Sequence, residues 1–196
     1  MRKIVFAGFL ALSLICSIAF ASPVVDLQQG ETAAGFDVST FTPRLSDNSG
    51  SAVSFSGSGA ADFYVQHGLT DRFTLGLEFS NFNAAFSVKA TDITLQYKLD
   101  NHFKLLLGDR NYDTNIGVND SQLLWGVSAS TPLGSQWNGY AAFKATSDET
   151  EWQLGVNKEI AQNLTLDLAF KNHNYDLGGG ANLVLNGPSL GLTYKF

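Results

Sequence analysis

The sequence predicts an all-β protein, folded as a single closed antiparallel transmembrane β-barrel of about ten strands, with eight strands as the alternative. Three observations predict this class. Apolar and polar residues alternate along most of the chain, the period-two pattern of strands with two different faces. Turn-forming residues separate the alternating segments, and no segment shows the periodicity of an amphipathic helix. Beyond the N-terminus, no stretch approaches the roughly 20 consecutive apolar residues of a spanning helix.

The N-terminus has the three parts of a secretory signal peptide. Two basic residues precede an apolar run over 4–20, and Ala19 and Ala21 form an Ala-x-Ala cleavage site. A retained membrane anchor is the alternative, but the run is short for a spanning helix. We therefore expect residues 1–21 to be removed and residues 22–196 to form the barrel.

Removal of the signal peptide changes both charge and cysteine content. It takes away two basic residues and no acidic one, so the net charge of −6 becomes −8. An acidic chain repels nucleic acid, which disfavours that class of partner. Cys16 is removed as well, so the mature chain must be stable without disulfides. A mean hydropathy near zero leaves a soluble exported β-domain or a membrane β-barrel.

Ten segments carry the alternation, with apolar residues at every second position. The first five contain Ala34, Phe36 and Val38; Val53, Phe55, Ala61, Phe63 and Val65; Phe73, Leu75, Leu77 and Phe79; Ile93, Leu95, Tyr97 and Leu99; and Phe103, Leu105 and Leu107. The other five contain Leu123, Trp125, Val127 and Ala129; Trp137, Ala141 and Phe143; Trp152, Leu154 and Val156; Leu164, Leu166, Leu168 and Phe170; and Leu190, Leu192, Tyr194 and Phe196. An even number of strands closes into a barrel. If the first two segments do not span, the barrel has eight strands.

The connections between these segments alternate in length. Four are tight, at residues 68–71, 100–101, 132–135 and 159–162. The others are mostly longer, at 42–51, 81–88, 111–120 and 174–186, with 147–150 as the short member. With ten strands, every tight turn falls at one end of the barrel, as in membrane barrels with short periplasmic turns and longer outer loops.

The polar face of the segments decides which medium the apolar face contacts. Glycines recur on the polar face: Gly35, Gly76, Gly108, Gly126, Gly155 and Gly191. Glycine weakens a strand and brings no benefit to a surface in water, but it fits a narrow lumen where a sheet must bend. We therefore expect the apolar face to contact lipid. The alternative is a soluble sheet in which these glycines are incidental.

Aromatic residues provide a second test, because lipid-facing barrels concentrate them in girdles at the two interfaces. One predicted girdle lies near the tight turns and contains Phe73, Tyr97, Phe103 and Trp137. The other lies toward the longer loops and contains Trp125, Phe143, Trp152 and Phe170. Outward positions between the two are aliphatic or small. An aromatic stripe in a protein core is the alternative, but a core has no reason to sort aromatics by height.

With the apolar side outward, charged side chains point into the lumen. The predicted network contains Asp37, Asp62, Glu78, Asp92, Lys98, Lys104, Arg110, Lys144, Glu151, Asp167 and Lys171. With Glu149 and Lys195 included, seven acids oppose six bases. Such charges must pair or stay hydrated, because an unpaired buried ion costs several kcal/mol. We expect a structural network that plugs or narrows the lumen, with a selective pore as the alternative.

The chain ends in SLGLTYKF, with Leu190, Leu192, Tyr194 and Phe196 at alternating positions. This ending resembles the C-terminal signature of bacterial outer-membrane β-barrels, and the mature chain resembles the small barrels of the outer membrane protein A and X types. The resemblance implies a location in the bacterial outer membrane and the lipid bilayer as a partner. It also implies that the barrel-assembly machinery reads those four residues. The best-known small members have eight strands, whereas this sequence predicts ten.

The sequence predicts no catalytic, cofactor-binding or metal-binding site, and no enzyme. His173 is expected at the outer end near Asp176, Asp109 or Glu149, and a lone histidine there is more often an exposed loop residue. The acidic loop at 113–120 does not satisfy the calcium-loop pattern. We expect an integral outer-membrane barrel, structural or a narrow passive pore. The alternatives are a porin-like channel for small solutes, a loop-mediated adhesion or recognition protein, and an outer-membrane hydrolase. No external ligand is indicated.

Overall fold

The computed structural model describes residues 24–47, 49–83, 87–114, 119–177 and 179–196, and in these ranges it contains eleven β-strands and no helix. The strands are β1 (Thr32–Ser46), β2 (Ala52–Ser54), β3 (Ser58–Gly68), β4 (Phe73–Asn83), β5 (Ser87–Lys98), β6 (Phe103–Thr114), β7 (Asn119–Gly134), β8 (Trp137–Ala145), β9 (Glu149–Ala161), β10 (Leu164–Asp176) and β11 (Asn182–Lys195). A helix long and apolar enough to cross a membrane is absent from the described part. The predicted signal peptide lies outside the described residues.

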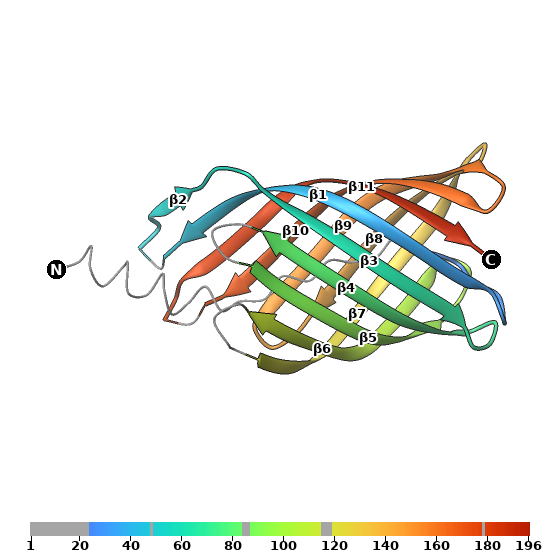
Figure 1. Ribbon diagram of the computed structural model, residues 1–196, viewed down its shortest axis with the longest axis horizontal. Coiled ribbons are helices and arrows are strands. Elements are labelled where there is room, and N and C mark those ends of the chain that lie inside the picture. The colour runs from blue at the N-terminus through green and yellow to red at the C-terminus, as the bar shows by residue number, and fades with distance from the viewer. Residues whose placement is uncertain (1–23, 48, 84–86, 115–118, 178) are drawn as a thin grey trace.

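Ten of these strands form a closed antiparallel barrel, which confirms the predicted fold class and strand number (Figure 1). Each barrel strand pairs with its neighbours in sequence, and β11 pairs with β1 along its length, from Ala33 opposite Lys195 to Ser46 opposite Asn182. The short β2 pairs only with the far end of β1. Closure matters because lipid offers no hydrogen bonds to an open sheet edge.

Four short connections lie at one end of the barrel, which we call the turn end; the opposite end is the loop end. The short connections are residues 69–72, 99–102, 135–136 and 162–163. The chain closes at the turn end, where the backbones of Thr32 and Phe196 exchange two hydrogen bonds of 3.0 and 2.8 Å. The C-terminus and the start of β1 therefore lie together (Figure 1).

The predicted long loops are mostly strand, so this prediction was wrong. The strands continue through much of the four segments, for example β1 to Ser46, β10 to Asp176 and β11 from Asn182. The connection at residues 146–148 is short, as predicted for 147–150. The polar segments look like loops because most of their outward side chains are polar, yet the backbone ladder continues. Residues 48, 84–86, 115–118 and 178 of these segments lie outside the described residues.

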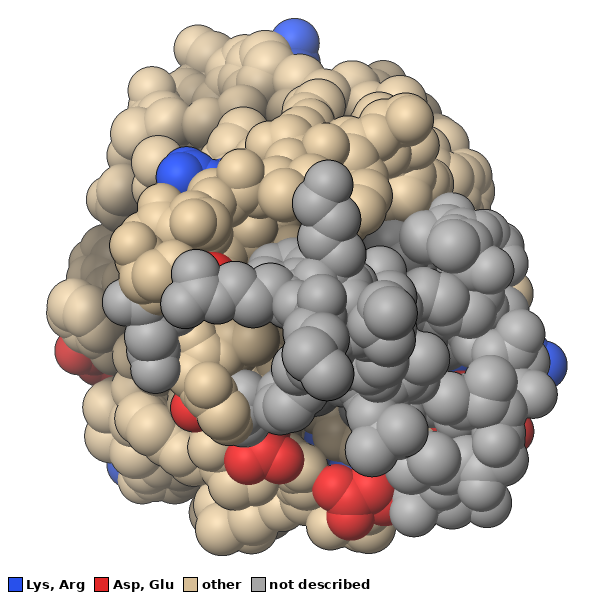
Figure 2. Space-filling model, turned by 90° about the vertical axis from the view of Figure 1, so that its left-hand side faces the viewer, with Lys and Arg blue, Asp and Glu red and all other residues tan. Residues whose placement is uncertain are grey.

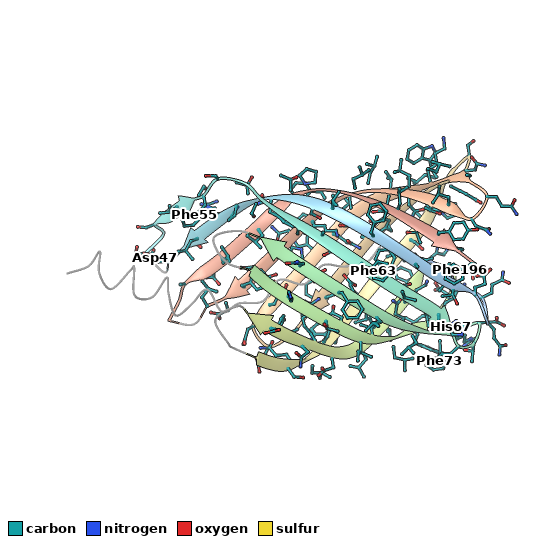
Figure 3. All side chains as sticks on the ribbon, viewed as in Figure 1. Asp47, Phe55, Phe63, His67, Phe73 and Phe196 are labelled. Carbon is teal, nitrogen blue, oxygen red and sulfur yellow. The ribbon has the colours of Figure 1, made fainter. Side chains whose placement is uncertain are left out.

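The two faces of the barrel wall are as predicted. Large apolar side chains cover the outside; Leu107 is 56% exposed and Leu154 is 61% exposed. Phe63, Phe73 and Phe196 point away from the barrel (Figure 3). Charged residues on the same strands are buried inside. An apolar exterior around a polar interior is the arrangement of a transmembrane barrel.

Two of the inward glycines make room for tyrosine rings. A Cβ on Gly35 would lie 2.3 Å from the hydroxyl oxygen of Tyr64, and one on Gly155 would lie 2.5 Å from the ring of Tyr140. Both rings lie flat against the neighbouring strand, so only glycine fits beneath them. The glycines therefore serve the narrow lumen that the sequence predicted.

Candidate functional site: the charged lumen

The candidate site is the interior of the barrel, where charged side chains from opposite walls meet. The part nearer the loop end is built around Arg110 of β6, which is fully buried. Its guanidinium binds Asp92 of β5 through two hydrogen bonds of 2.8 and 2.7 Å. It also donates to Glu149 at 2.7 Å and to Glu151 at 3.2 Å. Since Glu149 and Glu151 belong to β9, three strands away from β6, these contacts bridge the lumen.

His173 of β10 joins this cluster, which corrects the expectation of an exposed loop residue. Its side chain is fully buried, with Nδ1 3.3 Å from Glu149 Oε1. Its ring meets Phe41 edge-on at 5.5 Å and stacks on Tyr175 at 6.3 Å. The expected neighbour Glu149 is correct. The sequence missed the burial because His173 was expected at the outer end of its strand, next to a loop at 174–186, whereas β10 continues to Asp176.

Glu149, Glu151 and His173 are also the one described group whose donor atoms could surround a metal ion, since these atoms all lie within 4.8 Å of one another. Both carboxylates, however, already accept hydrogen bonds from Arg110. Tyr112 donates a further bond of 3.0 Å to Glu149. A guanidinium thus occupies the position of the cation, and the arrangement fits an ion-pair network better than a metal centre.

A second cluster surrounds Lys171 of β10. Its Nζ lies 2.8 Å from Asp37 of β1 and 3.4 Å from Asp62 of β3. Ser189 of β11 donates to the same Asp37 oxygen at 2.7 Å. Burying a lysine is costly unless it is paired, and here two carboxylates pair with it. Asp167, four residues before Lys171 on β10, accepts a hydrogen bond of 2.8 Å from the Tyr140 hydroxyl.

A third ion pair crosses the lumen between Lys144 of β8 and Glu78 of β4, with an Nζ to Oε2 distance of 3.4 Å. The Lys144 Nζ also lies 3.8 Å from Asp92 Oδ2. In the circular strand order, β4 and β8 lie on opposite walls. A lysine and a glutamate side chain can meet across the barrel only where its bore is closed by them. Both side chains are buried, so the lumen is narrowed by its own side chains at this height.

The predicted network is divided in the structure, because Lys98 and Lys104 do not reach the central clusters. Both bind Asp26 at the turn end, at 2.8 and 3.4 Å. Lys195 reaches the backbone oxygen of the same residue at 2.8 Å. The count of seven acids and six bases was made for the whole inward face; in the central clusters the described basic residues are Arg110, Lys144 and Lys171, with His173.

Asp26 belongs to a segment that sequence reasoning missed, residues 24–31, which we call the strap. The strap enters the mouth of the barrel at the turn end, and its Val25 and Leu27 are buried with Ala33 of β1. Lys104 donates a hydrogen bond to the Val25 carbonyl. Between the strap and Lys144 lies a cavity of about 30 Å³. Two spaced apolar residues carry too little signal to be recognised as a plug.

The loop end is closed differently, by apolar side chains that point inward. The cluster, which we call the apolar cap, contains Phe41, Leu45, Ala60, Tyr175, Leu183 and Leu185. Among the described residues on this face, acidic side chains lie together near its lower edge in Figure 2. The lumen thus meets an apolar cap at one end and the strap at the other.

The residues predicted to form girdles all lie on the outer surface, and several are in ring contact. Their pairs are Phe73 with Tyr97 at 5.0 Å, Trp125 with Phe143 at 5.7 Å and Trp152 with Phe170 at 6.0 Å. Phe103 is 52% exposed, and Trp137 lies under the Lys158 ammonium at 5.3 Å. The C-terminal residues Leu190, Tyr194 and Phe196 are also exposed, and Leu192 is partly so.

Solved structures share this fold. An outer membrane channel from Pseudomonas putida F1 is 16% identical, covering 90% of this chain and 99% of its own, with a TM-score of 0.51. Neisserial surface protein A is 15% identical, covering 86% and 100%, with a TM-score of 0.44. The attachment invasion locus protein of Yersinia pestis is 11% identical, covering 86% and 100%, with a TM-score of 0.39. No family model and no curated protein matches the chain. The chain therefore has the β-barrel fold of an outer-membrane protein.

Proposed function

We propose that this protein is a structural barrel of the bacterial outer membrane whose lumen is closed. The observation that carries the proposal is the contact of Lys144 with Glu78 at 3.4 Å across the lumen. The Arg110 and Lys171 clusters support it, as do the strap and the apolar cap. Closure by paired charges gives a rigid wall without a water-filled path, because each cation already has carboxylate partners.

The orientation follows from the four short connections at the turn end. We place the turn end in the periplasm, as in other membrane barrels with short turns on that side. The signal peptide, residues 1–21, would be removed on export, which leaves the strap as the start of the mature chain. Leu190, Leu192, Tyr194 and Phe196 would then be presented to the barrel-assembly machinery at the periplasmic side. The exposed aromatic residues would form the two interfacial girdles.

Planar-bilayer conductance tests the closed lumen directly. We expect the purified protein to insert without steady open-channel current. The double variant Glu78→Ala/Lys144→Ala removes the cross-lumen contact and its charges together, and we expect it to conduct. A steady current through the unchanged protein would overturn the closed barrel. It would favour a narrow pore selective for cations, given the excess of acids over bases in the centre.

The proposal includes the absence of catalytic activity. The buried His173 is held by Glu149 and by two aromatic rings, away from the position of a base beside a nucleophile. Peptide and lipid A cleavage assays, with His173→Ala as the control variant, test this point. Cleavage that depends on His173 would contradict it. Exchange of the loop-end connections followed by binding assays tests the recognition alternative.

A further inference from the structure

Three lysines of the barrel wall converge on one residue of the strap. Lys98 of β5 and Lys104 of β6 bind the carboxylate of Asp26, at 2.8 and 3.4 Å. Lys195 of β11 donates to the backbone oxygen of Asp26 at 2.8 Å. In the circular strand order, β6 and β11 lie opposite each other. The three ammonium groups therefore approach Asp26 from opposite walls of the mouth at the turn end.

The charges at this mouth do not balance. Among the described residues, Asp26 holds the only carboxylate within 4.0 Å of any of the three ammonium groups. Two other acids at this end bind backbone N–H groups: Asp71 accepts from Gln29, and Asp100 accepts from His102. One negative charge thus faces three positive charges, and ammonium groups brought together in this way repel one another unless anionic charge lies between them.

The site can be reached from water. The Asp26 side chain is 59% exposed, although it lies between the lysines, and the Lys98 side chain is partly exposed. Only Lys104 is buried. An anion at the turn end can therefore approach the ammonium groups without passing through the charged lumen.

The strap is fixed to the barrel mainly at one end. Its turn, residues 28–31, exchanges two backbone hydrogen bonds of 2.8 and 2.9 Å with Gly68. A Cβ on Gly68 would overlap the Gln28 carbonyl oxygen, so only glycine fits beneath this turn. In the described part of the chain, residues 24–27 make no backbone bond of this kind to the barrel, and are held by two buried apolar side chains and by the lysines. These four residues can leave the mouth while the turn stays in place.

We propose that Lys98, Lys104 and Lys195 form a binding site for a phosphate group, and that the Asp26 carboxylate occupies this site as a built-in competitor. A phosphate group brings a charge of about −1.5 to −2 at pH 7 and three strong acceptor oxygens, one for each lysine, whereas Asp26 brings a single charge. Lysine is a common phosphate ligand that acts as a point charge. Binding therefore matches the three cations better than the strap does, and it releases residues 24–27.

A phosphorus NMR titration of inorganic phosphate into the barrel, folded in a non-ionic detergent, tests the site. Asp26→Asn removes the competing charge. A site that its competitor fills for about nine-tenths of the time binds about tenfold more weakly, so we expect Asp26→Asn to bind phosphate at least about tenfold more tightly than the unchanged protein. The double variant Lys98→Met/Lys104→Met should lose binding. The matched control is Lys158→Met, which removes a lysine that lies over the Trp137 ring and should leave binding unchanged.

Hydrogen exchange of residues 24–27 tests the competition. In the unchanged protein, phosphate should speed up this exchange, whereas sodium chloride of equal ionic strength should not. Equal effects of the two salts would mean that salt only screens the ion pairs, and would overturn the proposal. A parallel titration with glycerol phosphate distinguishes the sources of the group: tighter binding than inorganic phosphate supports a larger phosphorylated molecule, and equal or weaker binding supports the free ion.

A folded Asp26→Asn barrel that binds phosphate no more tightly than the unchanged protein would overturn the proposal. So would binding that survives the removal of both Lys98 and Lys104. Heat-modifiable gel migration shows whether each variant is folded, and a gain of binding by Asp26→Asn cannot be imitated by loss of structure. The site lies at the mouth, on the turn-end side of the contact between Lys144 and Glu78. A barrel that binds phosphate but conducts steadily would therefore refute only the closed lumen, and one that is closed but binds no phosphate would refute only this site.

Discussion

The wall of the barrel and its extension at the loop end use the same strands in opposite ways. In the wall, Leu168 faces outward and is 42% exposed while Asp167 is fully buried. In the extension of the neighbouring strand, Leu183 and Leu185 are buried inside and Val184 between them lies outward. The alternation continues, but the apolar face has changed sides.

The difference shows that the medium outside the barrel sets which face is apolar. In hydrocarbon, the outer face must be apolar, and the polar residues left inside pair with one another. In water, the outer face can be polar, and apolar residues gather inside as in a small soluble barrel. In the proposed membrane location, the apolar cap is therefore the core of the part outside the membrane, and the charged clusters are the core of the part within it.

The largest effect is expected where the embedded core loses a cation. Lys171→Met leaves Asp37 and Asp62 buried without their partner, and breaking a buried pair in this way costs about 3–5 kcal/mol. Urea titration of the barrel folded in vesicles measures the loss. The triple variant with Asp37→Asn and Asp62→Asn should recover much of it, because no charge is then stranded. A triple variant as unstable as the single one would show that Lys171 acts through packing.

The next effect tests the boundary between the two regions. Leu168→Arg places a charge on the lipid face, and such a charge costs about 2–4 kcal/mol near the midplane. Val184→Arg, outward in the extension, should cost about 0–1 kcal/mol if that surface is in or near water. The measurement is the free energy of unfolding in vesicles. Similar costs at the two positions would place the extension within the hydrocarbon and remove the distinction.

The same boundary explains how far the sequence could predict the molecule. Leu168 and Asp167 were assigned to the correct faces because hydrocarbon makes the alternation strong. Residues 42–46 and 182–186 were expected to be loops because most outward residues there, such as Arg44 and Asn186, are polar and the alternation is weak. Pairings such as Lys144 with Glu78 join strands far apart in the sequence, so a period of two contains no information about them. The strap was missed because it belongs to no strand.

A smaller effect tests how closely the embedded lumen is packed. Gly155→Ala would bring a methyl group to 2.5 Å from the Tyr140 ring, whose hydroxyl is held by Asp167 at 2.8 Å. Overpacking of this kind costs about 1–3 kcal/mol. The comparison is Gly191→Ala, also inward, where the nearest atom is the Phe36 carbonyl oxygen at 3.2 Å and a slight shift suffices. Thermal unfolding in detergent should rank Gly155→Ala as the more damaging, and the reverse order would contradict a tightly packed lumen.

The smallest effect is expected at the turn end, where the strap is held by charge and not by a continuous ladder. Partial burial acts to raise the pKa of Asp26, but the hydrogen bond from Lys98 and the charges of Lys104 and Lys98 outweigh it, so the pKa lies below its ordinary value of 3.8. A carboxyl with a lowered pKa stabilises the folded strap above that ordinary value, and the contribution is lost as the pH falls through the lowered pKa. Hydrogen exchange of residues 24–31, corrected for the intrinsic pH dependence, should therefore speed up in acid below about pH 4. Asp26→Asn should exchange faster at neutral pH and show no further acid step. If both proteins show the same acid step, a titratable group other than Asp26 holds the strap.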